Sequence, residues 1–201
     1  KIGIMGGTFN PVHNGHLFLA ESAWEQAELD KIVFMPTKNP PHKDNREIIS
    51  QQHRMEMVRL AIEGNPHFEL SAMELEREGV TYTADTLSIL TKENPDTKYY
   101  FIIGADSLFM MQEWHTPRAI FNLSTILVAG RDRVPAKQMN GQIKLFEDAY
   151  DANIILLDMP AIELSSVAIR KRVSENKTIR YYVPDKVMDY IRKNELYITE
   201  D

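Results

Sequence analysis

The chain has no cysteine among its 201 residues, which excludes disulfide bonds, thiol catalysis and metal sites with cysteine ligands. Long apolar runs are missing too, and no stretch approaches the roughly 20 residues that a helix needs to span a bilayer. Glycine and polar residues interrupt the N-terminal segment at once, unlike a secretory signal peptide. We therefore expect a cytoplasmic protein that does not bind a membrane.

Positive charge is scarce as well. The 23 lysines and arginines are outnumbered by 29 aspartates and glutamates, which gives a formal net charge of −6. A basic field normally supplies much of the affinity for nucleic acids, so this balance argues against a nucleic-acid partner. The hydrophobic content of 43% and the length suit one globular domain with a sizeable core. The sequence leaves open whether the chain forms a homo-oligomer.

Apolar runs of strand length alternate with segments of helical spacing along the chain. Strands are predicted over 2–5, 32–35, 68–73, 99–103, 126–129 and 154–157, and helices over 15–26, 51–63, 83–93, 138–149 and from 165 onward. This alternation predicts an α/β fold, a doubly wound, Rossmann-like parallel sheet with helices on both faces. Residues 1–201 would form one domain, in which about 165–201 make a small helical C-terminal subdomain.

The polar motifs follow the predicted strands directly. Gly6-Gly7 ends the first strand, Gly104-Ala105-Asp106 the fourth and Gly130-Arg131 the fifth, while the sixth leads to Ser165-Ser166. In a parallel sheet the carboxyl ends of the strands meet at one edge, where ligands bind near the point at which the strand order reverses. We therefore expect these motifs to meet at one site.

The first motif places two histidines at the start of a helix. After the glycine turn, His13-Asn14-Gly15-His16 opens the segment over 15–26. Backbone N–H groups and the positive end of a helix attract phosphate, and two imidazoles three residues apart could donate to the same phosphate. Gly15 between them leaves room for a nucleotide to lie against the backbone.

The histidine pair could instead serve a metal or the helix itself. Histidines three residues apart can share a metal ion, although there is no cysteine and no carboxylate lies nearby in the sequence. The histidines could also be helix caps or satisfied core residues. The coincidence of glycine turn, strand and helix favours the phosphate.

With Gly-Gly-Thr-Phe-Asn-Pro before it, the His-Asn-Gly-His pattern resembles the nucleotidyltransferase superfamily. The resemblance implies that ATP lies on this stretch and that His13 and His16 donate to its phosphate oxygens. Asn10 departs from the pattern, because the superfamily more often has aspartate there. Class I aminoacyl-tRNA synthetases carry a related motif, but this chain is too short and too acidic to be a good candidate.

A second cluster, Ser165-Ser166-Val167-Ala168-Ile169-Arg170, lies where another helix would begin. Hydroxyls and free N–H groups at a helix start, with a guanidinium one turn further on, would bind phosphate oxygens. The alternative is an ordinary N-capped helix with basic residues near its end. The cluster resembles the Ser-Ser-Thr-x-x-Arg signature of the same superfamily, with Val167 in place of threonine, and this implies that both ends of the chain clamp one ATP.

Three further stretches narrow the family. Pro40-Pro41-His42-Lys43, the stretch over 82–87 (Tyr-Thr-Ala-Asp-Thr-Leu) and the stretch over 104–108 followed by Trp114 look like those of bacterial nicotinate-nucleotide adenylyltransferases. The resemblance runs essentially end to end. It implies that ATP and nicotinate mononucleotide react to give deamido-NAD and pyrophosphate in NAD biosynthesis, with Mg²⁺ carried by ATP and no dedicated protein ligands for the metal.

The same resemblance implies roles for individual residues. Catalysis would rest on His13, His16 and Arg170. The residues expected to bind ATP are Gly6, Gly7, Thr8, Phe9, His13, His16, Gly104, Asp106, Ser165, Ser166 and Arg170. The acceptor would be bound by Lys43 near the reacting phosphates, Thr83 at a helix start, Asp106 at sugar hydroxyls and Trp114 stacked on the pyridine ring.

Ordinary roles stay possible for the acceptor residues. Lys43 could be a solvated loop lysine, Thr83 a helix cap and Trp114 a core aromatic. The remaining histidines carry no pattern of their own and are expected at the surface or in structural roles; they are His42, His53, His67 and His115.

Two alternative functions stay open. An adenylyltransferase of the same fold could use nicotinamide mononucleotide, phosphopantetheine or riboflavin phosphate as its acceptor. A non-catalytic nucleotide sensor is the second alternative. The histidine pair together with Arg170 argues against a sensor, because such donors matter most where charge develops.

Overall fold

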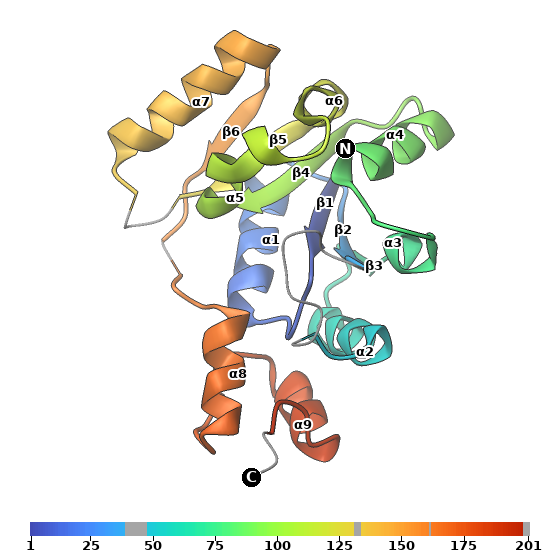
Figure 1. Ribbon diagram of the computed structural model, residues 1–201, viewed down its shortest axis with the longest axis vertical. Coiled ribbons are helices and arrows are strands. Elements are labelled where there is room, and N and C mark those ends of the chain that lie inside the picture. The colour runs from blue at the N-terminus through green and yellow to red at the C-terminus, as the bar shows by residue number, and fades with distance from the viewer. Residues whose placement is uncertain (39–47, 131–133, 161, 199–201) are drawn as a thin grey trace.

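The computed structural model describes residues 1–38, 48–130, 134–160 and 162–198. Within these residues six strands form one sheet in the order β3-β2-β1-β4-β5-β6, and every neighbouring pair is parallel (Figure 1). The strands are β1 (Ile2–Gly7), β2 (Lys31–Pro36), β3 (Phe68–Leu70), β4 (Tyr99–Gly104), β5 (Thr125–Ala129) and β6 (Ile154–Leu157). The α/β parallel sheet predicted from the sequence is confirmed.

Alternation along the strands divides the core between the two faces of the sheet. Met5 of β1 and Phe34 of β2 belong to one buried cluster, whereas their neighbours Ile4 and Met35 belong to the other. Successive side chains of a strand point to opposite faces, so a central strand covered on both sides must be apolar at every position. This explains the continuous apolar runs in the sequence.

Four helices contribute buried residues to the cluster that contains Met5. They are α1 (Asn14–Gln26), α2 (Gln51–Ile62), α8 (Ser166–Ser174) and α9 (Asp185–Lys193). Ala20 and Ala23 of α1 are fully buried, and such small side chains let the helix approach the sheet closely.

The other cluster holds residues of α4 (Thr83–Glu93), α5 (Ala105–Met110), α6 (Pro117–Leu123) and α7 (Ala136–Tyr150). A short 3-10 helix over Met111–Glu113 follows α5, and α3 (Met73–Glu76) lies beside β2. Helices therefore cover both faces, as predicted. None of the helices in the described ranges is long and apolar enough to cross a membrane.

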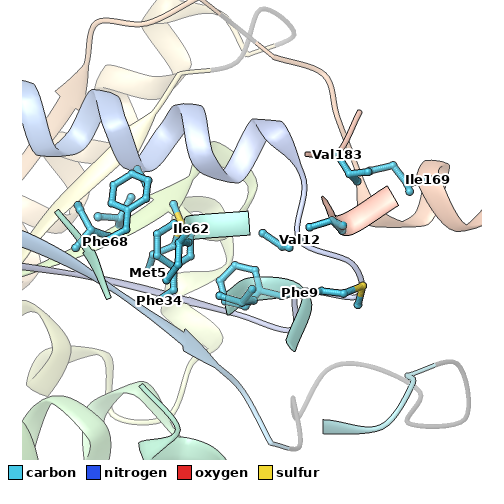
Figure 2. Packing of buried hydrophobic residues seen from close by; sticks show 14 of the residues in the cluster. Met5, Phe9, Val12, Phe34, Ile62, Phe68, Ile169 and Val183 are labelled. Atoms are coloured by element: carbon cyan, nitrogen blue, oxygen red, sulfur yellow. The ribbon is translucent and has the colours of Figure 1, made fainter. Parts of the chain in front are cut away.

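The C-terminal helices share one core with the sheet. Figure 2 shows Phe9 and Val12, from the loop after β1, lying between Phe34 of the sheet and Ile169 of α8. Phe9 and Val12 are 2% and 0% exposed. The loop that carries the first motif is therefore packed between the sheet and the C-terminal helices. The division into a main domain and a C-terminal subdomain stays a prediction.

Two expected elements differ from the structure. The predicted strand over 68–73 is wrong at its end, because β3 stops at Leu70 and Met73 begins α3. The hydroxyl of Ser71 accepts from the N–H of Met73 at 3.3 Å, which turns the chain out of the sheet. The helix expected over 138–149 begins earlier, at Ala136, directly after Pro135.

The strand order reverses between β1 and β4, which are neighbours in the sheet although β2 and β3 lie between them in the sequence. Sheets of this kind bind ligands at the carboxyl ends of the strands beside the reversal. In this chain those ends are Gly7 and Gly104, the points at which the first motif and the Gly-Ala-Asp motif begin.

Candidate active site

The two histidines of the first motif lie face to face at the start of α1. Their ring centroids are 3.7 Å apart and the ring planes differ by 23°. The backbone N–H of His13 donates to Nδ1 of His16 at 3.2 Å, so His16 caps the helix as well as facing the site. Because Nδ1 accepts this bond, a neutral His16 ring carries its proton on Nε2.

Gly15 makes this stacked arrangement possible. A Cβ at position 15 would lie 3.1 Å from Nδ1 of His13 and 3.4 Å from Cβ of Leu164. The distance to the His13 ring is tight for a side-chain carbon, so glycine at position 15 leaves room for that ring, whereas the distance to Leu164 is an ordinary contact.

His13 is almost completely buried, with 6% of its surface exposed. Burial lowers the pKa of its imidazole from 6.5 to about 4, because the charged ring would lose its hydration. At neutral pH His13 is therefore uncharged, and it can act as a hydrogen-bonding group but not as a cation.

The depressed pKa of His13 predicts a loss of stability in mild acid. Between pH 6.5 and 4 the unfolded chain binds a proton at this histidine that the folded chain does not, so stability falls as pH falls. From pH 7 to 5 we expect the wild type to lose about 2 kcal/mol more than His13→Asn, a variant with a good helix-capping residue. Urea unfolding of both proteins at the two pH values measures this, and equal losses would contradict it.

The second cluster is tied to the first by hydrogen bonds. Ser166 Oγ donates to the carbonyl of Pro11 at 2.8 Å, and Arg170 Nη1 donates to the carbonyl of Asn10 at 3.0 Å. Ser165 caps α8, with its hydroxyl accepting from the N–H of Ala168 at 3.2 Å. The capping role weighed from the sequence therefore holds for Ser165, and the start of α8 is fastened to the loop before α1.

Both clusters line one cavity of about 530 Å³, called here the larger cavity. Eight of the residues predicted to bind ATP line it: Thr8, His13, His16, Gly104, Asp106, Ser165, Ser166 and Arg170. The loop after β1, the end of β4 and the start of α8 thus meet at the strand-order reversal, as the topology required.

A second cavity of about 490 Å³, called the smaller cavity, adjoins the larger one. Thr8 and Ser107 line both. Thr83 and Trp114, two of the predicted acceptor residues, line the smaller cavity, and both volumes lie within the range usual for small-molecule sites.

A buried acid lies in the wall of the smaller cavity. Glu74 is 6% exposed, and the hydroxyl of Thr86 donates to its Oε1 at 2.8 Å. Arg77 Nη1 donates to the same hydroxyl oxygen at 2.9 Å, so the three side chains form one network beside the start of α4. Burial raises the pKa of Glu74, because the carboxylate loses its hydration.

Comparison with known proteins identifies the family. Residues 4–172 match the Cytidylyltransferase-like family. The chain is 50% identical over 198 residues, 98% of its length and 99% of the relative's, to a protein of Lachnoclostridium phytofermentans named a probable nicotinate-nucleotide adenylyltransferase. It is 42% identical over 197 residues, 98% of each chain, to the nicotinate-nucleotide adenylyltransferase of Bacillus subtilis. The chain belongs to the nicotinate-nucleotide adenylyltransferase family.

A solved structure shares the fold of this family member. The nicotinic acid mononucleotide adenylyltransferase of Plasmodium falciparum, described as complexed with NaAD, superimposes with a TM-score of 0.81 at 20% sequence identity. The likeness covers 98% of this chain and 96% of the other. The resemblance recognised from the sequence is confirmed at the level of family and fold.

Some residues predicted to bind ATP or the acceptor in this nicotinate-nucleotide adenylyltransferase family member do not lie where they were expected. Gly6 and Gly7 line the smaller cavity and not the larger one, and Phe9 lines neither cavity, because its ring is buried against His16. Ser166 lines the larger cavity, but its hydroxyl already donates to Pro11. Lys43 lies outside the described residues, as does Arg131.

For two of the predicted acceptor residues, Trp114 and Thr83, the structure can be compared with the ordinary roles considered from the sequence. Trp114 packs edge-on against Phe101, with ring centroids 6.1 Å apart, and also lines the smaller cavity, so it is both a core aromatic and a cavity wall. Thr83 is the first residue of α4 rather than its cap, a position that Tyr82 occupies.

Several residues of the smaller cavity were not predicted from the sequence. His115, expected in a surface or structural role, stacks on Tyr82 with ring centroids 4.2 Å apart, and both line the cavity. Glu74 lines it too. The position of His115 directly after Trp114 was the one available signal, because Trp114 was already predicted to contact the acceptor.

No group of three or more histidine, aspartate or glutamate side chains in the described ranges is arranged to hold a metal ion. Asp106 is the one carboxylate among the described residues that line the larger cavity of this family member.

Proposed function

We propose that the chain transfers the adenylyl group of ATP to nicotinate mononucleotide, giving deamido-NAD and pyrophosphate in NAD biosynthesis. One observation carries the proposal: two cavities adjoin at Thr8 and Ser107, and the histidine pair stands at the larger one. A reaction between two substrates needs neighbouring sites that hold the reacting atoms together. Curated relatives that match over nearly the whole chain bear the name of this activity.

ATP occupies the larger cavity in this proposal. His13 and His16 donate to the α- and β-phosphate oxygens, and Arg170 with the N–H groups at the start of α8 holds the β- and γ-phosphates. The hydroxyl of Ser166 is engaged with Pro11, so this residue contributes its backbone N–H. Gly104 and Asp106 face the ribose, whose hydroxyls can donate to a carboxylate.

Nicotinate mononucleotide occupies the smaller cavity. Trp114 provides a flat face for the pyridine ring, and the start of α4 at Thr83 offers N–H groups and a favourable dipole to its carboxylate. Lys43 stays a proposed contact of the reacting phosphates.

The reaction needs no nucleophile from the protein. The ionised 5′-phosphate of the acceptor attacks the α-phosphorus of ATP, a new P–O bond forms, and the bond to pyrophosphate breaks in line with it. Catalysis then consists of alignment and stabilisation of the charge that builds up on the phosphate oxygens. Neutral His13 and the Nε2–H of His16 are suited to this task, since a hydrogen-bond donor need not be charged.

Nucleotidyltransferases of this kind use ATP with a divalent metal, and we propose that the ion is Mg²⁺. Mg²⁺ favours phosphate oxygens and water and needs few protein ligands. A single carboxylate among the described residues lining the larger cavity fits an ion that arrives with the nucleotide. When bound, the ion would neutralise part of the phosphate charge. We also propose that the chain acts in the cytoplasm, where ATP is supplied.

A pyrophosphate-release assay with ATP and one acceptor at a time tests the function. We expect kcat/KM for nicotinate mononucleotide to exceed that for nicotinamide mononucleotide by roughly 10- to 10⁴-fold, because one or two charge-assisted hydrogen bonds select the carboxylate. Trp114→Ala should raise KM for the acceptor and leave KM for ATP nearly unchanged. Phosphopantetheine and riboflavin phosphate serve as controls.

If pyrophosphate is released only with one of the other three acceptors, that acceptor is the substrate in place of nicotinate mononucleotide. If pyrophosphate is released with none of the four, the enzyme assignment is wrong and the nucleotide sensor is favoured. Equal kcat/KM for acid and amide would reject only the preference for the acid.

A further inference from the structure

The loop between β1 and α1 contains a residue in a costly backbone conformation. Phe9 has φ of 49°, in the left-handed region that non-glycine residues rarely adopt. Such a conformation costs free energy and persists when the surrounding structure fixes it. Two side chains that line neither cavity bond to the loop on either side of Phe9, namely Arg54 of α2 and Tyr197 near the C-terminus.

Arg54 fixes the loop before Phe9. Its Nη1 donates to the carbonyl of Thr8 at 2.7 Å, and its side chain is 1% exposed. That carbonyl belongs to the peptide unit that leads into Phe9, and Thr8 lines both cavities. A hydrogen bond from a buried guanidinium is among the strongest that a carbonyl can accept.

The charge of Arg54 has no acidic partner in the part of the chain that the structure describes. A buried and uncompensated cation lowers stability, and an apolar side chain would fill the space at lower cost. Its Nε is also buried, with no hydrogen-bond partner among the described residues. Stability therefore does not explain an arginine at this position, whereas the bond to Thr8 gives it a function in holding the loop.

Tyr197 fixes the loop after Phe9. Its hydroxyl donates to Oδ1 of Asn10 at 3.0 Å, across 187 positions of sequence. Burial raises the pKa of this hydroxyl, so it stays protonated and able to donate. Asn10 is 4% exposed and lines the larger cavity.

Phe9 connects these two bonds to the proposed chemistry. Its ring meets the ring of His16 edge-on, with centroids 5.1 Å apart and planes at 74°. Figure 2 shows Phe9 held in the buried cluster beside Phe34, whose ring centroid lies 5.9 Å away. A shift of Phe9 would therefore be transmitted to His16, since the packed ring cannot move toward the sheet.

We propose that Arg54 and Tyr197 are positioning residues, which hold Thr8 and Asn10 so that Phe9 keeps His16 aimed at the nucleotide phosphates. This inference rests on the proposed function. It assigns a part in catalysis to two residues that touch neither substrate. Arg54 belongs to α2, and Tyr197 lies near the end of the chain.

The test is a cycle of variants that combines Tyr197→Phe with His16→Ala, measured by pyrophosphate release. Tyr197→Phe removes one hydroxyl and should lower kcat about three- to tenfold, as expected for one hydrogen bond, with KM for the acceptor unchanged. In the His16→Ala background the same change should lower kcat by less than about twofold, because the residue through which it acts is gone.

Tyr190→Phe is the matched control. Tyr190 lies in α9, and its hydroxyl pairs with Nδ1 of His53 in α2 at 2.9 Å, so the change removes a similar bond between the same regions away from the loop. It should leave kcat unchanged.

Arg54→Lys keeps the positive charge but changes the length and shape of the side chain. It should lower kcat as Tyr197→Phe does, whereas Arg59→Lys on the same helix should leave kcat unchanged.

Equal loss of kcat from Tyr197→Phe in both backgrounds would overturn the proposal, because the effect would not pass through His16. Wild-type kcat in Tyr197→Phe would overturn it as well, whatever the change in unfolding temperature. If Arg54→Lys does not fold, the Tyr197 cycle still decides. Failure of the proposed function can be told apart from failure of this inference, because the wild type itself would then release no pyrophosphate.

Discussion

Replacing His16 by alanine is expected to lower kcat by at least ~10²-fold, the usual scale for losing one preorganised donor at a developing charge. The expectation rests on the position of His16, which lines the larger cavity with its Nδ1 engaged by the N–H of His13. That bond orients the ring and leaves the proton on Nε2. Because the donor matters most when charge builds up on the phosphate, KM for ATP should change only modestly.

His16 also caps α1, so a loss of activity in His16→Ala needs a control for the cap. Glutamine three residues after the cap position can accept from the same backbone N–H, as in a standard capping box. His16→Gln should therefore keep the stability of the wild type and still lose most of kcat. Near-normal kcat in His16→Ala, or full recovery in His16→Gln, would show that this histidine serves the helix and not the chemistry.

Much of the fold followed from two regularities of the sequence. Apolar runs of strand length alternate with helical spacing, which fixed the class of sheet, and each polar motif followed a strand directly. Once parallel strands are assumed, their carboxyl ends must meet, so His16 and Arg170 could be placed at one site although 154 positions separate them. The structure brings both to the larger cavity. What they bind there remains the proposal.

The residues that sequence analysis missed act through contacts without a local pattern. Arg54 is an arginine in an ordinary helical segment until the structure places its guanidinium on the carbonyl of Thr8. Tyr197 reaches Asn10 from the far end of the chain. Ser166 shows the converse, since its place in a phosphate-binding pattern gave no sign that its hydroxyl fastens α8 to the loop before α1. Backbone carbonyls carry no sequence signal, and neither does a side-chain bond across 187 positions, so such contacts cannot be predicted from residue types.

Substitution of Arg170 is expected to have the second large effect on activity. Its Nη1 donates to the carbonyl of Asn10 at 3.0 Å while the side chain lines the larger cavity. The guanidinium is a planar fork with five N–H donors, so one residue can hold the loop and also bind phosphate oxygens. Lysine keeps the positive charge but has a single ammonium, which cannot serve both directions with fixed geometry.

We therefore expect Arg170→Lys to lower kcat/KM for ATP by about 10- to 100-fold, the equivalent of one charge-assisted hydrogen bond. KM for the acceptor should change much less, because Arg170 does not line the smaller cavity. Steady-state pyrophosphate release with ATP varied at saturating nicotinate mononucleotide measures the effect.

Arg172→Lys is the matched control, because it changes the same residue type on α8. Arg172 donates from Nε to the carbonyl of Thr178 at 2.8 Å and lies over the ring of Tyr182, outside the larger cavity. It should keep wild-type kcat/KM for ATP. If Arg170→Lys also matched the wild type in kcat and in KM for ATP, positive charge alone would suffice at this position, and the fork would have no part in binding the polyphosphate.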